Sequence, residues 1–105
     1  MKIYGIKNCD KVRNTLKWCL QNGIECVLHD YRVDGIDNKL LNSFRLQHDI
    51  KELVNKRSTT WRTLSDDEKL HLSNDIIIAN PTLLKRPIVD CNGQLHVGYF
   101  PEKWI

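Results

Sequence analysis

The first third of the chain reads as a strand, a helix and a second strand with short links, and this order constrains the fold most. Residues 2–6 are a short run of β-forming residues, and residues 26–31 are another. Between them, residues 10–22 have the spacing of a helix that ends at Gly23. Two strands joined through one helix lie parallel with a right-handed crossover. The pattern therefore predicts a βαβ unit.

The predicted helix has a start signal and an apolar face. Asp10 is a residue type that caps helix N-termini, so we expect it to be the N-cap. Trp18 lies opposite the apolar face, and we expect it to be partly exposed. Side chains that recur at helical spacing predict the buried face, namely Val12, Leu16, Cys19 and Leu20.

The middle of the chain changes to short helical segments. Asp34-Gly35 predicts a turn, and the Ser65-to-Glu68 spacing is that of a capping box. Asn80-Pro81 interrupts the last segment, and Pro81 can start a further turn. The expected helices run from Asp37 to about His48, from Ile50 to Val54, from Ser65 to about Leu72 and from Asp75 to Ala79.

The last third returns to strands. Ile88 to Cys91 and Gln94 to Gly98 flank Asn92-Gly93, the dipeptide typical of a two-residue hairpin turn. Residues 101–105 predict a short closing helix that carries Trp104. We therefore expect an α/β sandwich with the order βαβ…ββα and a mixed sheet.

Composition narrows the classes of protein. The 105 residues predict a single domain, the net charge of +3 is spread along the chain, and no basic block suggests nucleic-acid binding. No apolar run is long enough to span a membrane, and no signal peptide is apparent. The four cysteines have neither C-x-x-C nor zinc-ligand spacing, so we expect no metal. We predict a reduced, cytoplasmic protein that is monomeric.

Cys9 is the cysteine with a chemical setting. It lies where the first strand gives way to the helix, near backbone N–H groups without a helical acceptor and near the positive end of the helix dipole. Both features favour the thiolate, which is the nucleophilic form. The alternative is that Cys9 is a small, half-buried residue in a tight turn.

Three blocks of sequence resemble one known family. They are residues 4–10 (YGIKNCD), 55–62 (NKRSTTWR) and 80–88 (NPTLLKRPI). In this order they resemble the arsenate reductase (ArsC)-like family, most closely its Spx/YffB-type branch of bacterial proteins. The resemblance covers nearly the whole chain and implies a thioredoxin-like fold, with its core in residues 1–33 and 80–105 and a helical insertion over 34–79.

The resemblance also implies a site. Cys9 matches the catalytic cysteine of the family, and Arg57 and Arg86 match arginines that bind an anionic substrate. Pro87 matches a cis-proline whose backbone pairs with an extended thiol substrate. Asn8 and Arg13 lie in matching stretches beside the cysteine, and we include them as candidates for anion binding.

Two departures from the family pattern shift the expected chemistry. Arsenate reductases have a further arginine after the last strand, where this chain reads Gly98-Tyr99-Phe100-Pro101. Redox-sensing Spx proteins have C-x-x-C, whereas this chain has Val12. The sequence therefore favours thiol chemistry over arsenate turnover, without a local disulfide switch.

Two functions remain open at this point, beside a third interpretation in which the chain is a thioredoxin-fold remnant whose cysteine has no role. The first is an oxidoreductase, a glutathione-dependent thiol or oxyanion reductase that uses Cys9 alone. It would hold no bound cofactor, take glutathione or another small thiol as co-substrate, and act on a small or protein disulfide. The alternative is a non-catalytic Spx-like regulator that binds a protein such as RNA polymerase.

The thiol that would release a substrate from Cys9 is expected to come from outside the chain. Cys19 lies ten residues along the same helix, or about 15 Å away at 1.5 Å per residue. A disulfide needs Cα atoms within about 7 Å, so the helix would have to unfold. We expect Cys19 in the core and structural roles for Cys26 and Cys91.

Overall fold

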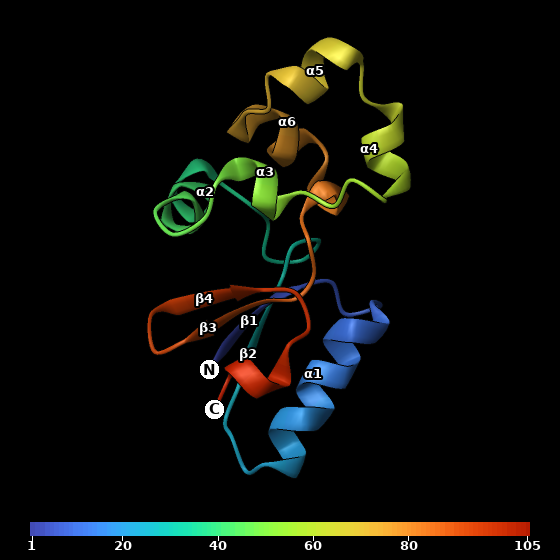
Figure 1. Ribbon diagram of the computed structural model, residues 1–105. Coiled ribbons are helices and arrows are strands. Elements are labelled where there is room, and N and C mark those ends of the chain that lie inside the picture. The colour runs from blue at the N-terminus through green and yellow to red at the C-terminus, as the bar shows by residue number, and fades with distance from the viewer. The chain divides into compact units, whose positions relative to one another are not determined.

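The computed structural model describes residues 1–105, which form two compact units (Figure 1). The first unit consists of residues 1–35 and 86–105, and the second of residues 36–85. Residues 80–85, which the sequence assigned to the core, belong to the second unit because hydrogen bonds tie them there. The Lys85 N–H donates to the Leu53 carbonyl at 2.8 Å, and the Asn55 N–H donates to the Leu83 carbonyl at 2.7 Å.

The first unit contains the mixed sheet. Its strands lie in the order β2-β1-β3-β4, with β1 parallel to β2 and antiparallel to β3, and β3 antiparallel to β4. This confirms the βαβ unit and the α/β class. The strands span Lys2–Gly5 (β1), Val27–Asp30 (β2), Ile88–Cys91 (β3) and Gln94–Val97 (β4).

The hairpin between β3 and β4 forms at the predicted turn. Asn92 and Gly93 both have positive φ angles, of 54° and 93°. The Gly93 N–H also donates to the carboxylate of Asp90 at 2.7 Å. This left-handed backbone is what an Asn-Gly pair adopts readily, and it matches the twist of the two strands.

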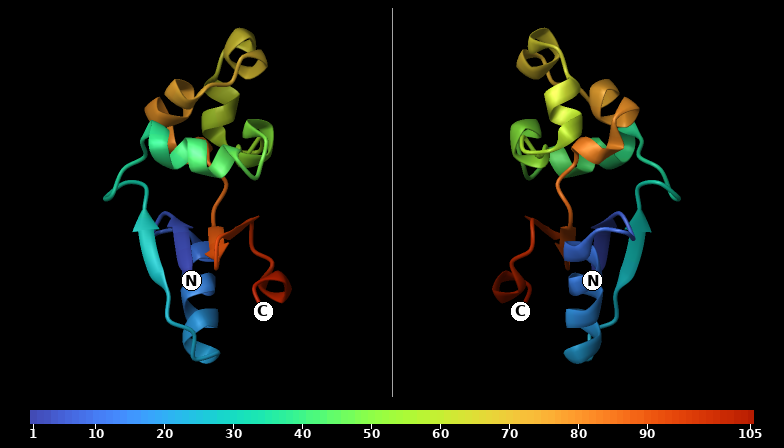
Figure 2. Two further views of the ribbon diagram at one scale, coloured as in Figure 1. Left: turned by 90° about the vertical axis from the view of Figure 1, so that its left-hand side faces the viewer. Right: turned by 90° about the vertical axis from the view of Figure 1, so that its right-hand side faces the viewer.

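Helix α1 (Asp10–Gln21) lies alongside the sheet (Figures 1 and 2). Its N-cap is Cys9 and not Asp10, because Cys9 keeps extended backbone angles while its carbonyl accepts the Arg13 N–H at 3.0 Å. At the other end, the N–H groups of Gly23 and Ile24 donate back to carbonyls of the last helical turn. Gly23 has a φ of 64°, so it terminates the helix as predicted.

The buried face of α1 differs from the prediction. Val12, Thr15 and Cys19 are buried, whereas Leu20 is 81% exposed. Thr15 occupies the centre of this face because its hydroxyl donates to the Lys11 carbonyl at 2.7 Å, which satisfies it within the helix. The prediction for Leu20 was therefore wrong. Trp18 is half-buried against Trp104, with ring centroids 5.2 Å apart.

Gly5 sets how closely α1 approaches β1. A Cβ atom on this residue would lie 2.5 Å from Cγ2 of Val12, inside any permitted contact. The absence of a side chain therefore brings the strand and the first turn of the helix together. The same helical turn follows directly after Cys9.

Asp30 connects the end of β2 to the loop that follows β1. Its carboxylate accepts hydrogen bonds from the N–H of Lys7 at 3.0 Å and from the N–H of Arg32 at 2.8 Å, and it is 8% exposed. Burial raises the pKa of Asp30, but these amides and that of Val33 outweigh burial, so its pKa lies below 3.8, the ordinary value. A buried carboxylate thus fixes the loop that leads to Cys9.

The second unit is built from short helices, each with a side-chain cap. Asp37, Asp49, Ser58, Ser65 and Ser73 accept a hydrogen bond from a backbone N–H at the start of α2 to α6 in turn. The elements span Asn38–Arg45 (α2), Ile50–Leu53 (α3), Thr59–Thr63 (α4), Asp66–Leu70 (α5), Asn74–Ala79 (α6) and, as a 3₁₀ turn, Pro81–Leu83 (η1).

The short helices of this unit differ from the predictions in several places. Helix α2 ends at Arg45, because Asp49 must be extended to cap α3. Helix α5 ends at Leu70, since Ser73 in turn caps α6. Helix α4 was not predicted, and it forms because the Ser58 hydroxyl accepts the Trp61 N–H at 3.1 Å. In the first unit, the closing segment is a 3₁₀ turn, η2 (Pro101–Lys103), followed by the buried Trp104.

We expect Asp30→Asn to lower the free energy of unfolding at pH 7 by about 2 kcal/mol, because a neutral amide accepts two buried N–H groups less well. The folded-state pKa of Asp30 is depressed, so its stabilisation is present above about pH 4 and is lost as the pH falls through that folded-state pKa. Urea denaturation at pH 7 and at pH 3.5 measures both effects. The difference between variant and wild type should shrink in acid.

The control is Glu25→Gln, which changes an exposed carboxyl of the same unit. We expect no change in stability at pH 7 beyond about 0.5 kcal/mol for this variant. Equal losses in Asp30→Asn and Glu25→Gln would contradict a specific role for the buried carboxylate.

Candidate active site

Cys9 occupies the turn between β1 and α1. Its N–H donates to the Ile6 carbonyl at 3.0 Å, and the residue is half-buried. As the N-cap it has φ and ψ angles of −89° and 129°, so its side chain lies at the open N-terminus of the helix. This is the position in which the sequence predicts a thiolate.

The pKa of the Cys9 thiol is lowered. Burial raises it, but the N–H groups of Val12 and Lys11, a hydrogen bond from the Arg86 guanidinium and the positive charge of Arg86 together outweigh burial. The sulfur makes no side-chain capping hydrogen bond of full geometry. We therefore regard the two amides as an electrostatic contribution that adds to the direct contact from Arg86.

Arg86 acts on the Cys9 thiol from the segment that precedes β3. It precedes Pro87, and the peptide bond between them is cis, as the resemblance implies for Pro87. Pro87 is buried, and its carbonyl accepts the Gly98 N–H at 2.8 Å. The two residues thus lie in the same unit as Cys9, and Arg86 contacts its thiol.

The other cysteines have a different chemistry. Burial and the neighbouring thiol of Cys26, which contacts Cys19 through a side-chain hydrogen bond, raise the pKa of Cys19. Burial and the charge of Asp90 raise the pKa of Cys91. Cys19 is 1% exposed, which confirms its assignment to the core. All four cysteines are free thiols, and the thiolate is favoured at Cys9 alone among the three with a shifted pKa.

The remaining predicted residues are placed as follows. Asn8 is exposed in the turn before Cys9, and Arg13 on α1 pairs with Asp10 one helical turn away. Arg57 belongs to the second unit, in the segment before α4, and is exposed. Its N–H donates to the Asn55 side chain at 3.0 Å, and no ion pair engages its guanidinium. The anion-binding roles of Asn8, Arg13 and Arg57 stay predictions.

The structure adds groups that the sequence did not indicate. The amides of Lys11 and Val12 act on the sulfur through the backbone, and Asp30 fixes the loop through Lys7. Asp30 is a carboxylate at the end of a strand and close in sequence to a turn, and this position is a signal that could have identified it. Tyr31 is 2% exposed and its hydroxyl has no hydrogen-bond partner, although the charge of Arg86 acts on it.

No group of three or more His, Cys, Asp or Glu side chains is arranged to hold a metal ion. No helix is both long and apolar enough to cross a membrane.

The mixed sheet, the cysteine at the start of α1 and the cis-proline before β3 define a thioredoxin-like protein with a helical insertion. The chain belongs to the ArsC family, whose model matches residues 4–105. An uncharacterized protein of Haemophilus influenzae is 46% identical over 106 residues, covering 97% of this chain and 93% of that protein.

Solved structures share this fold over almost their whole length. A protein named YFFB (PA3664) superposes with a TM-score of 0.87 at 29% identity, covering 98% of this chain and 94% of that one. A protein of Brucella melitensis described as related to arsenate reductase has a TM-score of 0.78 at 33% identity, with 98% and 89% covered. An arsenate reductase from Vibrio cholerae has a TM-score of 0.76 at 26% identity, with 98% and 94% covered.

We expect Arg86→Gln to raise the pKa of the Cys9 thiol and to slow its alkylation near neutral pH several-fold, because one charge-assisted hydrogen bond to the thiolate is lost. The measurement is the rate of carboxamidomethylation of Cys9 against pH, followed by peptide mass spectrometry. The control is Lys17→Gln, which removes an exposed charge farther along α1. It should leave the pH dependence of Cys9 alkylation unchanged. Identical profiles for wild type and Arg86→Gln would contradict the assigned contact.

Proposed function

We propose that this protein is a glutathione-linked thiol reductase that uses Cys9 as its single nucleophile. The observation that supports it best is the direction of the cysteine pKa shifts. Arg86 and the helix N-terminus lower the pKa of Cys9, whereas those of Cys19 and Cys91 are raised. Since the thiolate is the attacking species, Cys9 is the residue prepared for exchange with a disulfide.

The proposed reaction has two steps. The Cys9 thiolate attacks one sulfur of a disulfide, such as a protein–glutathione mixed disulfide, and takes the glutathionyl group. The substrate sulfur leaves with the electron pair and takes up a proton. The thiolate of a second glutathione then attacks the glutathionyl sulfur on Cys9, which yields oxidised glutathione and regenerates the Cys9 thiolate.

The second thiol is proposed to come from solution because no cysteine of the chain is suited to this role. Helix α1 is intact from Asp10 to Gln21, so Cys9 and Cys19 are separated by about 15 Å at 1.5 Å per residue. Cys19 is buried and contacts Cys26 beyond the far end of that helix. A glutathione-rich, reducing compartment such as the cytoplasm fits both this requirement and the four free thiols.

Arginines are proposed to select the anionic co-substrate. Glutathione has two carboxylates, and a guanidinium can bind each through paired hydrogen bonds. Arg86 contacts the thiol, and Arg57 has a guanidinium without an ion pair. The segment after β4 contributes no arginine, since Gly98, Tyr99 and Phe100 stand there. We therefore propose glutathionylated thiols, and not arsenate, as the preferred substrate.

The test is reduction of a glutathionylated peptide with glutathione as the reductant. We expect Cys9→Ser to abolish turnover, and we expect mass spectrometry of the wild type to find one glutathione adduct, on Cys9. Arg57→Gln should lower kcat/KM about tenfold, mostly through KM, because it removes one carboxylate contact. Arg62→Gln is the matched control, an exposed arginine of α4 in the same unit.

Some results would exclude this function. Full activity of Cys9→Ser, or an adduct on Cys26 in place of Cys9, would contradict the assigned nucleophile. Arsenate reduction that is faster than thiol reduction would contradict the substrate class. A protein partner bound equally well by wild type and Cys9→Ser, in the absence of any turnover, would support the regulator alternative.

A further inference from the structure

We propose that the helical unit has a second anion site, formed by Lys51, Lys56 and Lys69 around Trp61, that binds a small phosphorylated compound with an apolar part. A pocket of about 190 Å³ lies here, entirely within the second unit. Its lining residues are Lys51, Lys56, Trp61, Lys69, Leu70 and Leu72. None of these residues is among those proposed for the reaction.

The three lysines converge from different segments of the unit. Lys51 lies on α3, Lys56 in the segment that leads to α4, and Lys69 on α5. The ammonium groups of Lys56 and Lys69 lie 5.9 and 5.7 Å from the centroid of the Trp61 ring. Two cations on one indole are each attracted to its π-electrons but repel one another. An anion between them would remove that repulsion.

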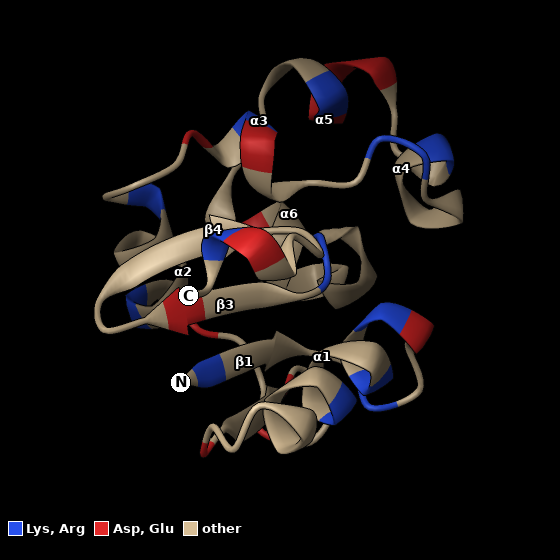
Figure 3. Cartoon of the chain, turned by 60° about the horizontal axis from the view of Figure 1, so that its bottom comes forward, with Lys and Arg blue, Asp and Glu red and all other residues tan.

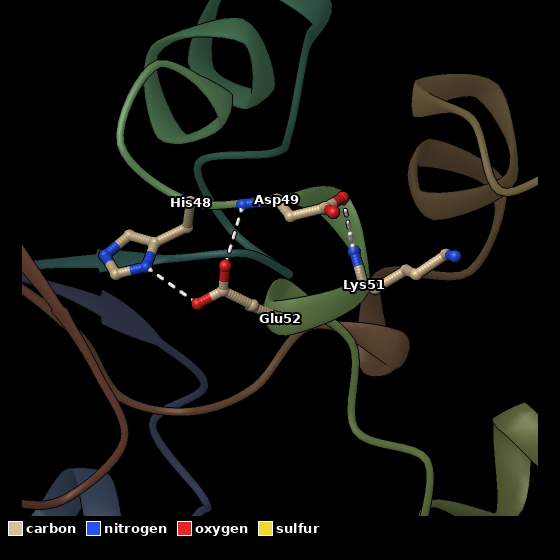
Figure 4. Close-up of polar contacts among 4 residues, drawn as sticks. All are labelled: His48, Asp49, Lys51 and Glu52. Atoms are coloured by element: carbon tan, nitrogen blue, oxygen red, sulfur yellow. Dashed lines mark hydrogen bonds and ion pairs between the residues drawn. The ribbon is translucent and has the colours of Figure 1, made fainter.

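No carboxylate of the protein neutralises these cations. None of the three lysines takes part in an ion pair. In α3 the acidic side chains serve the helix cap, because Asp49 accepts the Lys51 N–H and Glu52 accepts the Asp49 N–H at 3.2 Å. Figure 4 shows the Lys51 side chain extending away from Glu52, which also contacts His48 at 3.4 Å.

In α5, too, acidic side chains are engaged in a helix cap or with a histidine. Glu68 precedes Lys69, but its carboxylate accepts the Ser65 N–H at 2.9 Å in a capping box. Asp67 contacts His71 at 3.3 Å. The helix caps and histidines thus engage Asp49, Glu52, Asp67 and Glu68, and no carboxylate forms an ion pair with the three lysines, so the positive charge of the pocket is left for a ligand from outside the chain.

The surroundings favour a compact anion over a long one. Figure 3 shows acidic segments on α3 and α5 beside the basic ones. Asp66 and Asp67 in the first turn of α5 and Glu52 on α3 would repel an extended polyanion such as a nucleic acid. A single phosphoryl group is a compact ligand for lysine ammonium groups, which bind phosphate as point charges.

The floor of the pocket favours an apolar part on the ligand. Trp61 is half-buried, and Leu70 beside it is 75% exposed. A large apolar side chain exposed at the rim of a charged pocket gains contact area when a ring or short hydrocarbon covers it. The ligand class is therefore a phosphate monoester with an aromatic or aliphatic group, and phenyl phosphate is a suitable probe.

The experiment is a titration followed by the indole N–H resonance of Trp61, assigned by its loss in Trp61→Phe. We expect saturable binding of phenyl phosphate, about tenfold tighter than that of inorganic phosphate, since the ring adds apolar burial. Phenol alone should not bind measurably. The double variant Lys56→Gln/Lys69→Gln should weaken binding of phenyl phosphate at least tenfold, and rising salt should weaken it in the wild type.

Two controls separate this site from others. Lys39→Gln removes an exposed lysine of α2 in the same unit and should leave the affinity unchanged. Cys9→Ser should also bind phenyl phosphate normally, so failure of the proposed reductase activity would not affect this result. Circular dichroism establishes that the double lysine variant is folded, and Lys56→Arg should retain binding.

Several outcomes would overturn the proposal. They are an unperturbed Trp61 resonance at millimolar phenyl phosphate, equal binding by wild type and the double lysine variant, and equal binding of phenol and phenyl phosphate. A short single-stranded DNA that binds the same lysines more tightly than phenyl phosphate would also overturn it, because the site would then be a nucleic-acid surface.

Discussion

The buried carboxylate of Asp30 is the constraint on which the arrangement around Cys9 depends. It accepts amides from the loop after β1 and from the turn after β2, so the parallel strand pair and the loop are fixed by one group. That loop has to place Cys9 at the start of α1 while its own N–H groups are satisfied. The buried carboxylate of Asp30 holds the N–H group of the loop more rigidly than water could. The position of the thiol thus follows from a contact made by a residue of another strand.

A few close neighbours lower the pKa of the Cys9 thiol. Burial disfavours a thiolate at each of Cys9, Cys19 and Cys91, and at Cys9 it is outweighed. An open helix end and one guanidinium lower the pKa of Cys9. By contrast, another thiol near Cys19 and a carboxylate near Cys91 raise the pKa values of those two cysteines. Cys9, Cys19 and Cys91 therefore differ in chemistry because local charge outweighs burial at Cys9, whereas at Cys19 and Cys91 burial and the neighbouring group act in the same direction.

The sequence predicted the elements that local patterns specify. The βαβ order, the hairpin at Asn92-Gly93 and the helix stop at Gly23 all follow from short-range rules. Leu20 was assigned wrongly to the buried face, and the burial of Thr15 was not predicted, because apolar periodicity cannot foresee a hydroxyl satisfied within the helix. Cys9 could be chosen from its position, but Arg86 came from the family resemblance. The contact of Cys19 with Cys26 depends on tertiary packing that the sequence pattern does not encode.

Gly5 links the packing of α1 against β1 to the surroundings of the Cys9 thiol. The strand and helix are in contact at the place where a Cβ would overlap Val12, and the amide of Val12 is one of the groups that stabilise the Cys9 thiolate. Any side chain at this position would have to displace the side chain of Val12, in the helical turn whose amides face the sulfur. The residue at position 5 therefore affects the surroundings of the thiol as well as the packing, although it has no functional group of its own.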